Sequence, residues 1–185
     1  MRMRARRAQC RAWLACGALV IPLVAIGCGG DGTTGPTATL PPSTTPAATA
    51  SIAIYLPRGD VGTSCDRVFP VSRTVRSPAV LRGAMAALLR GPTAAERADG
   101  YGGWFSARTA GRLRRVAVTA GTARIDFRDF SRIVPNASSS CGSALLLAQL
   151  NRTATQFPTV RRAVYSFGGS PDRFYGWLQM DVPAG

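Results

Sequence analysis

Three acidic residues of this sequence are candidates for acid–base chemistry. Asp126 and Asp129 lie three residues apart, and Glu96 precedes them. Glycoside hydrolysis needs two carboxyl groups at a defined separation, but residues three apart in a strand point to opposite faces. The basic residues around the two aspartates are Arg124, Arg128 and Arg132. Ion pairs with such neighbours would lower the pKa of both aspartates, whereas a general acid needs a raised pKa.

Two residue types on which many active sites depend are missing from the chain. It contains no His, and all 23 basic residues are Arg. Without His there is no Ser-His-Asp or Cys-His nucleophile and no imidazole metal ligand. Without Lys there is no Schiff base and no P-loop lysine. The serines at 138–140 are therefore expected to cap a helix, and no catalytic residue, metal or cofactor is predicted.

A glycine-rich loop combines aromatic rings with nearby arginines. The aromatic residues are Tyr101, Trp104 and Phe105, and the arginines that follow are Arg108, Arg112, Arg114 and Arg115. In one interpretation, one or two of the rings fill the core beneath the loop. In the other, rings and arginines form an exposed surface that binds a partner.

The first 27 residues have the pattern of a bacterial export signal. Five arginines and no acidic residue occupy positions 1–11, and an apolar run of 16 residues follows, shorter than the ~20 that span a membrane. The run ends at Ala25-Ile26-Gly27-Cys28, which resembles the lipobox of bacterial lipoproteins, although Leu is commonest at the position of Ala25. In that family the cysteine carries a diacylglycerol and becomes the first residue. The resemblance predicts a lipid on Cys28; the alternatives are an uncleaved anchor helix and an ordinary signal.

Residues 28–50 consist mainly of Gly, Thr, Pro, Ala and Ser and are predicted to form a tether, because they cannot bury enough apolar surface to offset ordering. The folded domain is predicted at residues 51–183. Loss of the signal leaves 18 arginines against nine acidic residues, a charge near +9. Anionic lipids and acidic polymers would attract such a domain within about one Debye length.

Two cysteines, Cys65 and Cys141, remain in the predicted domain. An even pair in an oxidising compartment favours a disulfide, since redox-active pairs are usually closer in sequence and two thiolates without His make a poor zinc site. The bridge would stabilise the fold by roughly 4 kcal/mol through loop entropy. We therefore predict a structural disulfide.

Hydrophobic patterning predicts alternating strands and helices. Strands are expected at 51–56, 68–75, 160–167 and 174–180, and a hairpin at 112–119 and 122–130. Ser77-Pro78 is a typical helix start and Gly91-Pro92 a typical stop, and a second helix is expected at 141–156. This order indicates an α+β fold in which two helices pack on one face of a mainly antiparallel sheet.

Three segments resemble the GerMN domain, a sporulation and germination module. They are Ala87-Leu88-Leu89-Arg90-Gly91-Pro92-Thr93 with Glu96-Arg97; Leu113 through Val116-Ala117-Val118 and Gly121-Thr122-Ala123 to Ile125-Asp126-Phe127; and Gln156-Phe157-Pro158-Thr159-Val160. The resemblance spans residues 52 to 168, but the loop 101–106 differs from the Ser-Ala-Ile-Pro-like loop usual in the family. It implies a compact fold related to ring-building motifs of secretion and sporulation machines, and no catalytic residue.

These observations predict a lipid-anchored, extracytoplasmic, non-catalytic interaction domain. Its expected partner is a protein or an anionic envelope polymer at the outer face of the cell membrane, with a role in sporulation or envelope regulation. Nucleic acid also selects arginine with aromatic rings, but an exported lipoprotein rarely meets it. The alternative is a cell-wall hydrolase or transferase that uses Asp126, Asp129 or Glu96.

Overall fold

The computed structural model describes residues 48–59 and 64–184. The predicted signal, the lipidation site Cys28 and most of the predicted tether lie outside these residues. The first strand begins at Thr49, two residues before the predicted start of the domain. No helix among the described residues is long and apolar enough to cross a membrane.

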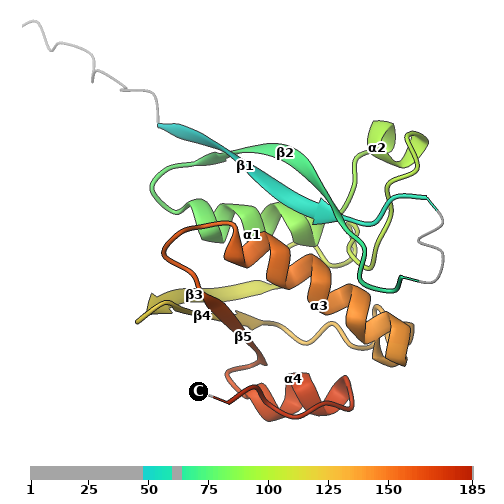
Figure 1. The fold of residues 1–185 in the computed structure, drawn as a ribbon, viewed down its shortest axis with the longest axis vertical. Helices are drawn as coiled ribbons and strands as arrows, with labels where there is room; N and C mark the ends of the chain where they lie inside the picture. Colours follow the sequence, from blue (N-terminus) through green and yellow to red (C-terminus); the bar gives the residue numbers. More distant parts are fainter. Residues whose placement is uncertain (1–47, 60–63, 185) are drawn as a thin grey trace, which may run out of the picture. The chain divides into compact units, whose positions relative to one another are not determined.

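Two strands form the first sheet. Strand β1 (Thr49–Leu56) pairs antiparallel with β2 (Phe69–Arg76) over eight residues (Figure 1). Ile52, Ile54 and Leu56 alternate with more exposed residues and point into the core, as the period-two pattern predicts. Both strands were expected from the sequence.

The second sheet contains three strands in the order β3-β4-β5. Strands β3 (Leu113–Thr119) and β4 (Thr122–Phe127) form the predicted hairpin, whose turn residues Ala120 and Gly121 both have positive φ. Strand β5 (Arg162–Phe167) lies parallel to β4. A parallel neighbour requires a crossover connection, and the helix between β4 and β5 supplies it.

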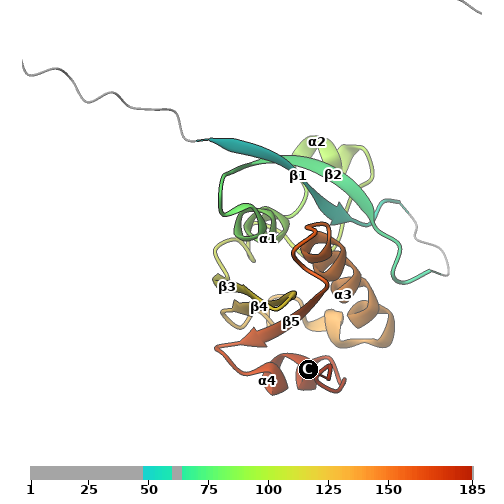
Figure 2. The same cartoon turned by 60° about the vertical axis from the view of Figure 1, so that its left-hand side comes forward.

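Helices α1 (Val80–Arg90) and α3 (Ser140–Thr155) lie between the two sheets, as Figures 1 and 2 both show. Helix α1 contacts β1, β2 and β3, and α3 contacts β1 and β5. The predicted α+β class is confirmed, but the strands form two sheets instead of one.

Side chains occupy the edge of β1 that does not pair with β2. The Gln156 side chain accepts from Ala53 N at 2.9 Å and donates to Ala53 O at 2.6 Å. Thr153 Oγ1 accepts from Tyr55 N at 3.1 Å. Side chains from α3 and the residue after it therefore occupy the edge where a third strand would pair.

The sequence predicted the end of α1 correctly but not its start. Gly91 ends the helix with φ of 70°, and a Cβ there would overlap the carbonyl oxygen of Phe105, so the glycine is required. The predicted cap at Ser77 is wrong, because Ser77 N donates to Ala48 O and extends the first sheet. The helix begins three residues later, at Val80, without a side-chain cap.

Two short helices were not expected. Helix α2 (Ala94–Ala98) begins with a capping box in which Thr93 and Glu96 bond each other's backbone N–H. Helix α4 (Pro171–Trp177) occupies part of the predicted strand at 174–180, so that prediction is wrong. Ser170 accepts from Arg173 N and Pro171 stands in the first turn, a start signal that the aromatic content of the segment obscured. A 3-10 turn, Pro135–Ser138, precedes α3, which Ser139 caps as expected.

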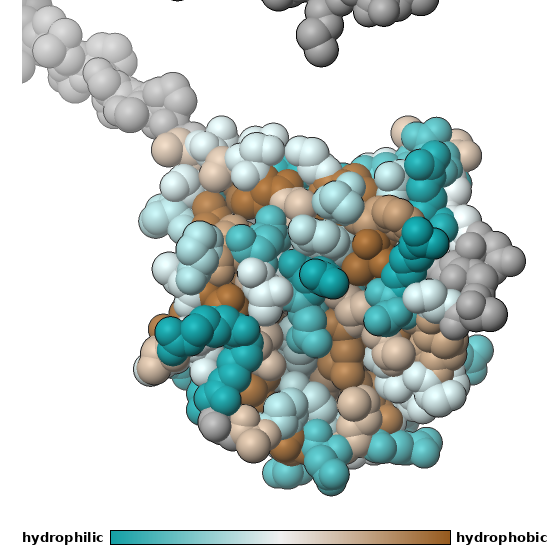
Figure 3. All heavy atoms as spheres, viewed as in Figure 1, coloured by the Kyte–Doolittle hydropathy of each residue, from teal (hydrophilic) through white to brown (hydrophobic). Residues whose placement is uncertain are grey.

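Aromatic rings fill the core between the second sheet and α4. Phe130 packs edge-to-face on Phe167 with ring centroids 5.1 Å apart, and Phe167 packs on Phe174 at 5.0 Å. On the face shown in Figure 3, hydrophobic residues show mainly between hydrophilic ones. Among the described residues, the exposed large hydrophobics are Val118 and Met180.

The predicted disulfide is present. Cys65, in the segment between β1 and β2, is bonded to Cys141 in the first turn of α3, and their Cα atoms lie 5.0 Å apart. The bond joins the first sheet to the helix layer across 76 residues of sequence.

Candidate functional site

A concave surface of about 650 Å³ lies on the face of the second sheet opposite the buried β4 residues Ala123, Ile125 and Phe127. We call it the arginine hollow. Three arginines and one carboxylate line it together with small and uncharged residues: Arg114, Arg115, Ala117, Thr119, Arg124, Asp126, Val164, Ser166, Gly168, Gly169 and Pro171. The hollow is therefore a basic surface whose other lining residues are mostly small.

Strand alternation places the residues of β4 in the hollow. Ala123, Ile125 and Phe127 are buried in the core, so Arg124 and Asp126 point to the opposite face. In the register of the sheet, Arg124 lies between Ala117 of β3 and Val164 of β5.

A β-bulge explains why two consecutive arginines of β3 line the same surface. The register shifts between Leu113 and Arg115, so the extra residue, Arg114, has no partner of its own in β4. A bulge leaves one residue outside the regular alternation. Arg114 and Arg115 consequently both reach the hollow, although strict alternation would separate them.

Both oxygens of the Asp126 carboxylate contact other groups of the chain. Its Oδ2 lies 3.2 Å from Arg114 Nη1, and its Oδ1 accepts from Ser166 Oγ at 2.8 Å and from Gly169 N at 2.7 Å. The side chain is only 16% exposed. Asp126 therefore holds Arg114 and the turn after β5 in place, and both of its oxygens are engaged by the chain itself.

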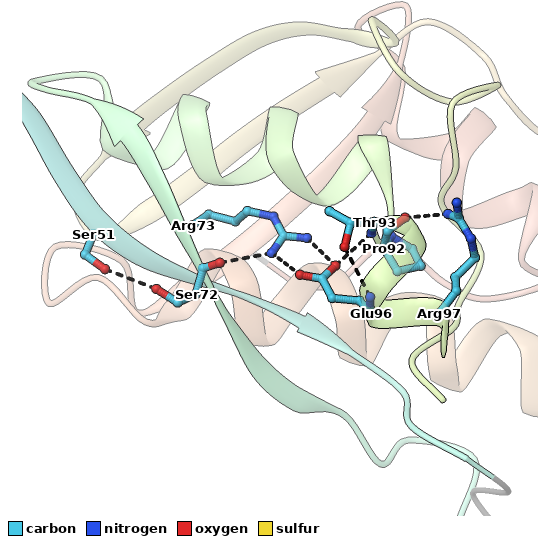
Figure 4. A network of polar contacts seen from close by, with 7 residues as sticks. All are labelled: Ser51, Ser72, Arg73, Pro92, Thr93, Glu96 and Arg97. Carbon is cyan, nitrogen blue, oxygen red and sulfur yellow. Dashed lines mark hydrogen bonds and ion pairs between the residues drawn. The ribbon is translucent and has the colours of Figure 1, made fainter. Parts of the chain in front are cut away.

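Glu96 is bonded just as completely, in α2. Arg73 reaches both of its oxygens, at 2.5 and 2.7 Å, and Thr93 N donates to it at 2.8 Å (Figure 4). The hydrogen bond from Arg73 is the main reason that the pKa of Glu96 lies below its ordinary value of 4.5, and this effect exceeds the opposing effect of burial.

Asp129 lies after β4 and does not line the hollow. Burial alone would raise its pKa, but hydrogen bonds from Ser131 and the charges of Arg173 and Arg132 lower the pKa below its ordinary value. The expected ion pairing of the aspartates is confirmed, although the bonded partners are Arg114 and Arg173 and not the three arginines expected.

The described residues hold no pair of carboxylates within the hollow, because Asp126 is the one acidic residue that lines it. Nor does any group of three or more His, Cys, Asp or Glu within 48–59 and 64–184 have a geometry that could hold a metal ion. What the hollow offers is guanidinium groups, which bind carboxylates and phosphates through paired hydrogen bonds.

The rings of the glycine-rich loop mainly contact the protein itself. Phe105 is 2% exposed and packs edge-to-face on Phe130, so it cannot contact a partner, and the core interpretation holds for it. Trp104 is half-buried and its Nε1 donates to Gly142 O at 3.1 Å. Tyr101 is half-buried, and the guanidinium of Arg58 lies 5.2 Å from its ring centroid.

The four arginines predicted after that loop separate into two groups. Arg114 and Arg115 line the hollow, whereas Arg108 and Arg112 do not. Arg112 instead donates to the carbonyl oxygen of Asp129 at 3.3 Å. The sequence reasoning missed Arg124 as a site residue, although its alternation with Ile125 placed it on the outer face of the predicted hairpin.

Comparison with known proteins gives one family. A family model described as Germane, sporulation and spore germination, matches residues 53–172. The chain is similar to a solved structure of the tandem GerMN domains of the sporulation protein GerM from Bacillus subtilis, with 19% identity and a TM-score of 0.45. The match covers 72% of this chain and 43% of that one, so the chain spans less than half of the solved protein's length. No curated protein matches.

Proposed function

Since the chain belongs to the Germane family of sporulation and spore germination domains, we propose that it is a non-catalytic interaction domain that binds an anionic partner through the arginine hollow. The partner is an envelope polymer or an acidic protein surface outside the cytoplasm. A lipid on Cys28 holds the domain at the outer face of the membrane, where it serves sporulation or envelope regulation.

One observation carries the proposal: three guanidinium groups line a hollow whose single carboxylate is already paired with one of them. Arg115 and Arg124 form no ion pair with another described residue, and Asp126 neutralises only Arg114. The hollow therefore keeps a local positive charge that attracts anions. The disulfide between Cys65 and Cys141 supports an oxidising compartment, in agreement with export.

No specific observation favours the alternative of a cell-wall hydrolase. The carboxylates that it would use, at positions 96, 126 and 129, lie in three different surroundings, and each accepts hydrogen bonds from the chain itself. Incubation of the full-length chain with cell-wall fragments tests the alternative directly. We expect no turnover; turnover abolished by Asp126→Ala with Asp129→Ala would establish the enzyme instead.

The proposal is tested by crosslinking the full-length chain to its surroundings in membranes and recovering it under graded salt. We expect partner recovery to fall with salt and to be lost in Arg114→Ser with Arg115→Ser. Arg128→Ser with Arg132→Ser is the matched control, because both side chains are exposed, carry the same charge and lie outside the hollow. Equal recovery with both double variants would refute the role of the hollow.

A further inference from the structure

We propose that the arginine hollow continues onto α1 and that the combined surface binds a linear polyanion, a polymer that repeats negative charges such as phosphodiesters along one chain. This inference rests on the proposed function and names the class of its partner. It adds a second group of arginines that the proposed function does not require.

The second group lies in a groove of about 370 Å³ beside α1. Its charged residues are Arg76 at the end of β2 and Arg82 and Arg90 of α1. We call it the α1 groove. Between these arginines the groove is lined by short side chains, among them Ala79 and Ala86, which leave space along the helix.

A hydrogen bond joins the α1 groove to the arginine hollow. Arg82 Nη1 donates to the carbonyl oxygen of Arg114 at 3.2 Å. Arg82 lines the groove and Arg114 lines the hollow, and α1 and β3 are in contact. The groove residue Arg82 therefore lies beside the backbone of the hollow residue Arg114, at the edge strand β3 of the second sheet.

The joined surface carries six arginines and one bonded carboxylate. The arginines are Arg76, Arg82, Arg90, Arg114, Arg115 and Arg124. Among ion pairs between described residues, Arg114 with Asp126 is the only one that involves any of the six. Such a density of guanidinium groups is complementary to closely spaced anions, above all to phosphate groups, whose oxygens accept paired hydrogen bonds from arginine.

The extent of this surface favours a polymer over a small anion. Arg82 and Arg90 are about 12 Å apart along the helix, and β3 extends about 16 Å from Arg114 to Thr119. One phosphate would occupy a small part of either concave surface. A linear chain can contact both, and its second contact is then intramolecular, which raises the affinity.

The chemistry of the surface also favours a polymer over a folded protein. Stable protein interfaces usually contain exposed aromatic or large hydrophobic anchors. Neither of the exposed large hydrophobics, Val118 and Met180, lines the hollow or the groove. Charge is thus the main recognition feature that the joined surface presents.

The test compares the binding of tripolyphosphate and long-chain polyphosphate to the full-length chain at fixed ionic strength. We expect the long chain to bind about 100-fold more tightly per molecule. Arg76→Ser with Arg90→Ser should weaken long-chain binding about tenfold and change tripolyphosphate binding less than about twofold. Arg114→Ser with Arg115→Ser should weaken both, and Arg128→Ser with Arg132→Ser reports the effect of lost net charge alone.

The outcomes separate this inference from the proposed function. One contrary result is that the Arg76 and Arg90 variant binds the long chain as well as wild type does; another is that it loses no more affinity than the Arg128 and Arg132 control. Either result means that the hollow acts alone and overturns the proposal that the joined surface binds a polymer. If the Arg114 and Arg115 variant binds both probes like wild type, the proposed function fails as well. Tighter binding to phosphatidylglycerol vesicles than to polyphosphate, weakened by loss of Arg76 and Arg90, would assign the surface to lipid and overturn the polymer. Circular dichroism melting confirms that each variant is folded.

Discussion

Ion pairs in this protein serve two different purposes, and their surroundings decide which. Arg73 and Glu96 are each less than a fifth exposed and fasten α2 to β2 through two parallel hydrogen bonds. Arg114 is about half exposed and shares Asp126 with a hydroxyl and a backbone N–H. The first pair contributes mainly to stability, whereas the second orients an arginine that remains accessible to a ligand.

Replacement of Glu96 by Gln tests the stabilising pair. The side chain keeps its size but loses its charge, and we expect the free energy of unfolding to fall by about 1–2 kcal/mol at neutral pH. The pKa of Glu96 is depressed in the folded state, so its contribution is fully present above about pH 4.5 and is lost as the pH falls through the folded pKa. Urea unfolding at neutral pH and in acid measures both effects.

The control for this change is Asp181→Asn, which removes one exposed carboxylate near the C-terminus. It should change stability by less than about 0.5 kcal/mol. A difference between wild type and Glu96→Gln that stays constant into acid would contradict the assigned role of the charge.

Gly91→Ala tests the close approach between the end of α1 and the loop at Phe105. The new Cβ would overlap the carbonyl oxygen of Phe105 in addition to straining a residue with φ of 70°, and we expect a loss of about 3 kcal/mol or more. Gly111→Ala has a similar φ of 74° with nothing within 4 Å, so it should lose only about 1 kcal/mol. Equal losses in thermal unfolding would show that no close contact exists at Gly91.

The sequence predicts individual residues best where a local rule applies. Gly91 as a helix stop and Ser139 as a cap follow from residue type and spacing, and both are confirmed. The burial of Phe105 could not be decided, because a ring in a glycine-rich loop fits the core and the surface equally well. Arg114 reaches the hollow beside Arg115 only through the bulge, and the sequence carries no clear signal for that register shift.

The free edge of β1 shows how one element controls the next. Gln156 presents an acceptor and a donor to the backbone of Ala53, as a neighbouring strand would, and Thr153 accepts from Tyr55 N. An edge closed in this way is protected from pairing with other chains. Among the described residues, no third strand pairs at this edge, and α3 packs directly against the first sheet.

Gln156→Ala should open this edge. Both bonded groups of Ala53 would lose their partner, and we expect the free energy of unfolding to fall by about 2 kcal/mol, with faster hydrogen exchange at the Ala53 amide. Thr155→Ala is the control, since its exposed hydroxyl bonds only the carbonyl of Asn151 within the helix. Unchanged exchange at Ala53 would show that Gln156 does not close the edge.

Local patterns predicted most elements but not how they assemble. The hairpin around Ala120-Gly121 and the helix at 141–156 are confirmed within a few residues. The strand predicted at 174–180 failed because α4 buries Phe174 and Tyr175 on one side, and two adjacent aromatics suit either element. The parallel pairing of β4 with β5 depends on the long crossover through α3, a contact between distant segments that periodicity does not encode.

Considered as a whole, the chain combines a basic folded domain with an N-terminal tether, and the first residue of the tether, Cys28, is predicted to carry a lipid. The described residues contain no helix long and apolar enough to span a membrane. We propose attachment through a lipid on Cys28, on the basis of the resemblance to a lipobox. It would bring the arginines of the domain close to anionic headgroups and polymers.

Cys28→Ser tests the attachment. We expect the wild-type chain to fractionate with membranes and to carry a diacylglycerol on its first residue after processing, and the variant to lose both properties. Mass spectrometry of the N-terminal peptide and membrane fractionation measure this. Membrane association of the variant equal to that of wild type would support an uncleaved anchor instead.

The claim that the arginine hollow is the binding surface is tested most directly by site-specific photocrosslinking in cells. A photoreactive residue at Ala117, within the hollow and opposite Arg124, is compared with one at Thr155, exposed on α3 outside the hollow. We predict a crosslinked product from position 117 alone, which disappears in Arg114→Ser with Arg115→Ser. The same product from both positions, or from position 117 in the arginine variant, would contradict the account.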